Sequence, residues 1–288
     1  MINIGLSSYS MSRAINDDRM SVFEVMDYIA KNGGQHMEVV PCGKLIVNGN
    51  DELISQMVQH AKDAGIALSS YTIGANFALD SKAEIDAEVE RVKGEIEVAA
   101  KLGVTRMRHD AGWKPASEAN YATFEKYLPG VVDSFGILAD YAKQYGIVTS
   151  LENHGYLFQG SERVQRVILG VNRDNFRTTL DVGNFLCADE DPVCAVMNNL
   201  PYASMIHFKD FYIREDQPAV TDGYFQSMHG RWLKGATTGE GDVDLKRITQ
   251  IIKDANYDGF LSIEFEGWED CIIACERSLR NVIALFNN

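Results

Sequence analysis

Four side chains of metal-ligand type each follow a short run of strand-forming residues. The runs read Thr-Ser-Leu-Glu152, Thr-Thr-Leu-Asp181, Ser-Met-Ile-His207 and Leu-Ser-Ile-Glu264. Three carboxylates that converge in a partly desolvated site repel one another strongly, so such an arrangement makes sense only around a cation. Three oxygen donors and one imidazole form a harder set than thiolates do, which favours Mn²⁺, Co²⁺, Mg²⁺ or Zn²⁺ over copper. The sequence therefore predicts one divalent metal ion but does not select among these four; we take Mn²⁺ as the first expectation.

The elements that must position these side chains alternate along the whole chain of 288 residues. Short runs rich in β-branched residues predict strands, and longer amphipathic segments predict helices between them. We expect strands at 2–7, 35–40, 67–72, 105–109, 148–152, 177–181, 204–207 and 260–265. We expect helices near 20–32, 51–64, 82–101, 119–145, 161–169, 189–198, 244–255 and 269–286. Eight such units of about 36 residues predict an α/β protein, a single (β/α)₈ TIM barrel domain over residues 1–288.

A barrel of this kind gives the four side chains a common location. Its catalytic groups lie at the carboxyl ends of the strands, which is where all four residues fall. For any one of them alone, a salt bridge at the barrel end or a helix cap is an equally good interpretation. Four ligand-type residues on consecutive strands favour the metal site.

Composition and charge restrict the class of protein. Hydrophobic residues make up 45% and charged residues 24% of the chain, the balance of a soluble globular protein. The net charge of −14 repels polyanions, and we find no basic patch that would bind nucleic acid. The N-terminal residues lack the pattern of a signal peptide, and no stretch is apolar enough to span a bilayer, so we expect a cytoplasmic location. The five cysteines form no CxxC pair, which favours reduced thiols.

Five motifs in this order resemble the xylose isomerase-like TIM barrels, particularly the sugar epimerase and inosose dehydratase branches. They are Glu152-Asn-His-Gly, Asp181-Val-Gly-Asn184, His207-Phe-Lys-Asp210, Gly239-Glu-Gly-Asp242 and Tyr257-Asp-Gly-Phe-Leu-Ser-Ile-Glu264. The resemblance covers essentially the whole chain. It implies that one metal binds Glu152, Asp181, His207 and Glu264, and that Glu152 and Glu264 also act as catalytic acid and base.

The chemistry that such a site supports is proton transfer next to a carbonyl group. A metal stabilises the negative charge that develops on the carbonyl oxygen. One glutamate then removes the proton to form an enediolate, and the other returns a proton from the opposite face, which isomerises or epimerises a sugar. If the intermediate instead expels a hydroxyl group, the same site is an inosose dehydratase-like lyase that acts on a cyclitol or keto-sugar.

Substrate recognition is expected from the loops that follow the strands. Arg108 and His109 are adjacent on one strand and should face opposite ways, so only one of them should enter the barrel mouth. For Glu38 the alternative is a structural charge partner, and for His109 a packed rim histidine. The candidate substrate-binding residues are Glu38, Asn76, Arg108, His109, Trp113, His154, Asn184 and Arg231.

Two positions depart from the ketohexose epimerase pattern. Asn184 stands where those epimerases carry a histidine three residues after the metal aspartate. Phe158 stands where some of them carry a second substrate-binding carboxylate. These departures argue for a substrate other than a free ketohexose.

The long segment 211–243 should form a lid, or else an oligomer contact or a disordered loop. In the turn that ends at Asp242, either Asp242 or Asp244 should cap exposed amides.

Two other functional classes are weaker interpretations. An abasic-site endonuclease uses a related barrel but needs several metals and more histidines than the six in this chain. A non-catalytic sugar-binding barrel has no need for two opposed glutamates. Since members of the family are often dimers or tetramers, the resemblance also implies a homodimer or homotetramer.

Overall fold

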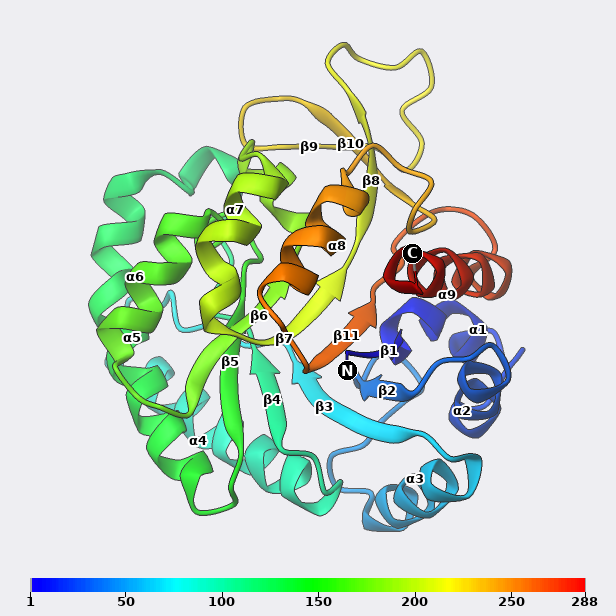
Figure 1. The fold of residues 1–288 in the computed structure, drawn as a ribbon. Coiled ribbons are helices and arrows are strands. Elements are labelled where there is room, and N and C mark those ends of the chain that lie inside the picture. The colour runs from blue at the N-terminus through cyan, green and yellow to red at the C-terminus, as the bar shows by residue number, and fades with distance from the viewer. Residues whose placement is uncertain (1, 288) are drawn as a thin grey trace.

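Eight parallel strands close into a barrel in the computed structural model, which describes residues 2–287. The order around the barrel is β1-β11-β7-β6-β5-β4-β3-β2, so successive barrel strands are neighbours, and β11 also pairs with β1 to close the barrel (Figure 1). The bounds are β1 Asn3–Ser7, β2 His36–Val39, β3 Ala67–Ile73, β4 Arg106–His109, β5 Val148–Glu152, β6 Phe176–Asp181, β7 Ala203–Phe208 and β11 Phe260–Ile263. The predicted single (β/α)₈ barrel is confirmed.

The connecting helices surround the barrel, as Figure 1 shows. They are α2 Val22–Lys31, α3 Asp51–Ala64, α4 Lys82–Lys101, α5 Tyr121–Lys143, α6 Ser161–Val171, α7 Pro192–Asn199, α8 Leu245–Asp254 and α9 Cys271–Asn287, with a short α1 Ser12–Asn16 after β1. The eight predicted helices match these within a few residues.

Helix starts are encoded locally by side chains that accept hydrogen bonds from free backbone amides. Ser21 and Glu24 form a capping box at the start of α2. Asp244 accepts from the Arg247 amide at the start of α8, so Asp244 is the capping residue there. Asp242 instead accepts from the Ile213 amide at 2.7 Å. Of the two predicted capping residues, the helix therefore uses Asp244.

The largest difference from the sequence prediction is the segment after β7. It forms a three-stranded antiparallel sheet from β8 Asp210–Arg214, β9 Phe225–Gln226 and β10 Trp232–Ala236, in the order β8-β10-β9. The Tyr156 hydroxyl donates to the Gln226 carbonyl at 2.9 Å, and the Met228 amide donates to the Cys187 carbonyl at 2.9 Å. The segment is thus an ordered sheet held against the loops that follow β5 and β6. Its role as a lid stays a prediction.

Among the helices within residues 2–287, none combines the length and the hydropathy that a membrane-spanning helix needs.

Candidate metal centre

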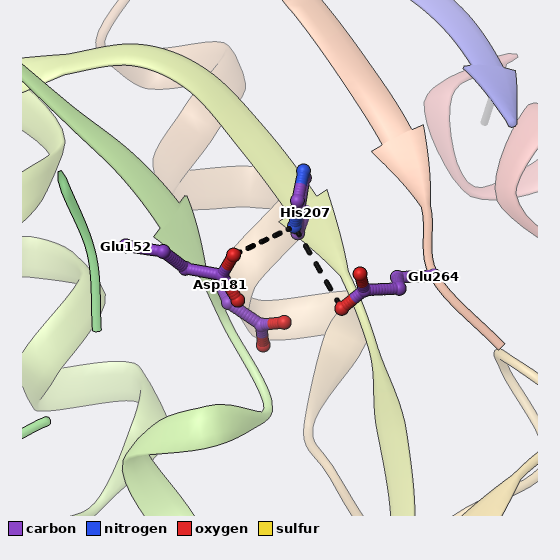
Figure 2. Close-up of side chains that lie close together, drawn as sticks. All are labelled: Glu152, Asp181, His207 and Glu264. Carbon is purple, nitrogen blue, oxygen red and sulfur yellow. Dashed lines mark ion pairs between the residues drawn. The ribbon is translucent and has the colours of Figure 1, made fainter. Parts of the chain in front are cut away.

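The four predicted ligand residues meet at one end of the barrel. Glu152 ends β5, Asp181 ends β6, His207 lies in β7, and Glu264 follows β11 directly. These are four neighbouring strands, and Figure 2 shows the side chains turned toward one another. Each residue offers one ligand atom, and these atoms all lie within 4.8 Å of one another. Parallel pairing causes this convergence, because it places Asp181 opposite His207 and Ser262 opposite His207 in adjacent strands.

The unsatisfied atoms of this cluster fit a bound cation. Glu152 Oε2, Asp181 Oδ2 and His207 Nδ1 are buried and accept or donate no hydrogen bond within the described part of the chain, although Arg108 and Lys209 lie close enough to the two carboxylate oxygens to form ion pairs. Buried polar atoms in native proteins nearly always have a hydrogen-bond partner, so three atoms without one in a single cluster need an explanation. A divalent ion between them would satisfy all three at once. The donor set of carboxylates and imidazole is also one that such ions accept.

The remaining atoms of the same side chains are held in place by neighbours. Asp181 Oδ1 accepts from the amides of Gly183 and Asn184, both at 2.8 Å. Glu152 Oε1 accepts from Asn184 Nδ2 at 2.9 Å. His207 Nε2 lies 3.0 Å from the Glu38 carboxylate, which orients the ring so that Nδ1 faces the cluster. A carboxylate behind a histidine ligand is a common arrangement in metal sites.

Two buried cations lie against the acidic cluster. Arg108 Nε is 2.7 Å from Glu152 Oε2, and Lys209 Nζ is 2.6 Å from Glu264 Oε2. Burial disfavours the ionised form of Glu152, but Arg108 and His207 outweigh it and hold the pKa of Glu152 well below its usual range. Burial raises the pKa of Glu264 to about 7, although Lys209 opposes that shift. The two glutamates therefore differ in their affinity for a proton.

A cavity of about 190 Å³ opens onto this cluster. Glu152 and Glu264 line it together with Arg108 and Lys209. The remaining lining residues are Tyr9, Val40, Thr72, Gly74, Asp110, His154 and Glu266. A larger cavity of about 600 Å³ lies at the opposite end of the barrel, where Ile2 precedes β1 and Tyr257 precedes β11. We base the candidate site on the smaller cavity, because its lining contains the acid, base and metal-ligand chemistry.

Three of the predicted substrate-binding residues lie in or beside the small cavity. Arg108 and His154 line it, and His154 Nδ1 is 3.1 Å from Asp110 Oδ1. Asn184 is buried and binds Glu152 rather than lining the cavity. Glu38 is fully buried behind His207 and is absent from the cavity wall, a position that fits the alternative of a structural charge partner.

His109 lies away from the barrel mouth. Its ring is fully buried in the layer between barrel and helices, with its centroid 4.6 Å from that of Phe135 and 6.1 Å from that of Phe77. Because side chains alternate along a strand, Arg108 enters the mouth and His109 faces outward. The structure therefore does not bring His109 to the cavity, and its surroundings fit the alternative of a packed histidine.

The other three predicted substrate-binding residues lie in loops outside the cavity lining. Asn76 Oδ1 accepts from the Ala78 amide, which fixes a turn after β3. Arg231 pairs with Glu215 at 3.1 Å within the segment after β7. Trp113 is 58% exposed in the loop after β4. The structure therefore does not bring Asn76 or Arg231 to the cluster, and it leaves Trp113 with a free aromatic face.

Three charged residues of the cavity wall were not predicted from the sequence. Asp110, Lys209 and Glu266 each lie two positions after a residue that the sequence did single out, namely Arg108, His207 and Glu264. Successive side chains in extended backbone point to opposite faces, so residues two apart share a face. Applying that rule beyond the last strand residue would have found all three.

Residues 26–279 match the sequence model of a family described as xylose isomerase-like TIM barrel. The inosose dehydratase of Clostridium perfringens (strain 13 / Type A) is 23% identical over 157 residues, which are 53% of this chain and 52% of that protein. The chain thus spans about half the length of the curated relatives it matches.

Solved structures show the same fold at low identity. A D-psicose 3-epimerase determined in the presence of D-fructose has a TM-score of 0.73 and 17% identity over 100% of both chains. The IOLI protein with a bound zinc atom has a TM-score of 0.77 and 17% identity, over 100% of this chain and 98% of that chain.

Proposed function

We propose that this chain, which belongs to the xylose isomerase-like TIM barrel family, is a metal-dependent sugar isomerase or epimerase. The observation that carries this proposal is the pair Glu152 and Glu264 on one small cavity. They come from β5 and β11, which are separated in the barrel by β6 and β7, so they approach the cavity from different sides. The two remaining donors, Asp181 and His207, complete a set that suits one divalent ion.

In the proposed reaction the two glutamates move a proton at the carbon next to a carbonyl group. A divalent ion held by the four donors would stabilise negative charge on the substrate oxygen. One glutamate removes the proton to form an enediolate, and the other returns a proton to the opposite face. The Arg108 guanidinium lies 2.7 Å from Glu152 and keeps that carboxylate ionised and directed at the cavity.

The cavity wall also carries groups that suit a polyhydroxylated substrate. His154 and Asp110 form a hydrogen-bonded pair on the wall, and Thr72 adds a hydroxyl group. Such groups can exchange hydrogen bonds with the hydroxyls of a sugar or cyclitol. A volume of about 190 Å³ favours a single small ring or short chain as the reacting unit.

A dehydratase is the second candidate, and the curated relatives favour it because those matched are named inosose dehydratases. The first step would be the same removal of a proton next to a carbonyl. The hydroxyl group on the neighbouring carbon would then leave as water after protonation. His154 and Lys209, both on the cavity wall, are donors available for that step in addition to the glutamates.

Incubation in deuterated water separates these functions. The metal-loaded protein would be mixed with ketoses, inososes and oxidised glycosides, and proton exchange would be followed by nuclear magnetic resonance. An epimerase incorporates deuterium beside the carbonyl and keeps the molecular formula, whereas a dehydratase releases water. Absence of exchange on every substrate would refute the proton-transfer mechanism.

The metal content provides a separate test. Elemental analysis of the purified chain should find about one divalent ion per chain, with Mn²⁺ as our first expectation among Mn²⁺, Co²⁺, Mg²⁺ and Zn²⁺. Two or three tightly held zinc ions would favour the endonuclease interpretation instead.

A further inference from the structure

Lys209 places a buried positive charge beside the proposed metal donors. Its side chain is 3% exposed, and Nζ lies 2.6 Å from Glu264 Oε2 and 3.3 Å from Asp181 Oδ2. The ammonium therefore contacts two of the four proposed ligand residues. The contact with Asp181 Oδ2 is an ion pair without a hydrogen bond, since that oxygen has no hydrogen-bond partner in the described chain.

The Lys209 ammonium and the buried carboxylates lower each other's cost of burial. Glu152, Asp181 and Glu264 are buried together and repel one another when ionised. A buried ammonium is equally costly unless anions surround it. In the protein without metal, the contacts of Lys209 with Asp181 and Glu264 reduce both costs at once.

A divalent ion on the same donors changes that balance. It would bring a second, larger positive charge to Asp181 and Glu264, and two cations at short range repel each other. The ammonium has two other partners within reach. Glu266 Oε2 lies 3.3 Å from Nζ on a side chain that is 35% exposed, and Asn184 Oδ1 also lies 3.3 Å away.

We propose that Lys209 is the internal counter-ion of the metal-free site and a positioning residue that sets its affinity for metal. When a metal ion binds, the ammonium gives up Asp181 and Glu264 and keeps Glu266 and Asn184. This inference rests on the metal site of the proposed function, but it does not depend on the reaction that the site performs. It gives Glu266, which is not a proposed ligand, a defined task as the alternative anion.

This change of partners by the Lys209 ammonium predicts opposite effects on metal affinity for two substitutions that each remove a charge. Lys209→Met removes the competing cation, so metal should bind about tenfold more tightly or better. The same variant should melt at a lower temperature without metal, because Asp181 and Glu264 lose their counter-ion. Glu266→Gln removes the alternative anion, so metal should bind about tenfold more weakly, as for other residues just outside a ligand shell.

The experiment measures binding of Mn²⁺ and of Zn²⁺ to the chelator-stripped full chain by isothermal titration calorimetry. Thermal unfolding with and without metal would be recorded for the same samples. Lys234→Met is the matched control, because Lys234 lies in β10, with Nζ 5.5 Å from the ring of Tyr224, and is not part of the cavity wall. Its affinity for metal should equal that of the wild type.

Tighter metal binding by Lys209→Met together with weaker metal binding by Glu266→Gln supports the inference. Weaker or unchanged binding by Lys209→Met overturns it, as does a wild-type chain that binds no metal. If Lys209→Met does not fold, Glu266→Gln decides, and unchanged binding by that variant overturns the change of partners. Failure of the proposed reaction looks different: metal would bind with the expected shifts, yet no substrate would exchange deuterium.

Discussion

Glu38 offers a direct test of how the metal centre is organised. Its carboxylate lies 3.0 Å from His207 Nε2, both side chains are fully buried, and the Thr72 hydroxyl donates to the same carboxylate. The carboxylate holds the ring with Nδ1 directed at Glu152, which is 3.6 Å away. Glu38→Gln removes the charge but leaves an amide oxygen that can accept from Nε2. Glu38→Leu removes the acceptor as well.

The expected magnitude follows from these contacts. Replacing the partner of a metal-binding histidine costs about 10-fold to 100-fold in metal affinity. Glu38→Gln should fall near the lower value, about 1.4 kcal/mol, because the acceptor remains. Glu38→Leu should approach the upper value, about 2.8 kcal/mol, because the ring also loses its orientation.

Isothermal titration with Mn²⁺ on metal-free protein measures both effects. Glu95→Gln is the matched control, because Glu95 is also a buried glutamate, yet it accepts hydrogen bonds from Tyr71 and Asn48 outside the cluster. The control should lower thermal stability and leave metal affinity unchanged. Equal affinities for wild type and Glu38→Leu would refute the orienting role, and a loss of affinity in Glu95→Gln would point to a general effect of destabilisation.

Three further predictions concern catalysis, acid stability and the rim. Glu264→Gln should still bind substrate but lose about 10²-fold to 10⁴-fold in kcat, and an unaltered rate would exclude it as acid or base. Burial lowers the pKa of His36 and of His109 to about 4, so only the unfolded chain takes up these protons as the pH falls from 6.5. Each histidine's contribution to the free energy of unfolding is therefore fully present above pH 6.5 and should fall by about 3 kcal/mol as the pH drops to 4. Denaturant titrations should show that the free energy of unfolding of His109→Phe falls less steeply with pH than that of the wild type. Equal pH dependence in the two proteins would contradict this. Trp113→Ala should raise KM about fivefold with little change in kcat, since it removes an exposed aromatic face at the rim, and an unchanged KM would show that substrate does not reach it.

Local patterns in the sequence are sufficient for most of the barrel. The predicted helices 51–64 and 82–101 coincide with α3 and α4, and the predicted strand 148–152 coincides with β5. These elements are determined by periodic apolar residues and by capping side chains within the same segment. The sheet β8-β10-β9 was missed because polar loops separate its strands and β9 has only two residues, so that the segment resembles an irregular connection.

The meeting of Glu152, Asp181, His207 and Glu264 also follows from sequence, because parallel strands bring their carboxyl ends to one side of a barrel. Only the tertiary structure assigned the partners of these residues. It placed Glu38 behind His207, although 169 positions separate them in the chain, and it placed Lys209 against Asp181 and Glu264. Strand periodicity determines which face of the sheet a side chain occupies. Buried charged groups on different strands come within contact distance only when all eight strands are assembled into the barrel, so their pairing depends on the tertiary structure.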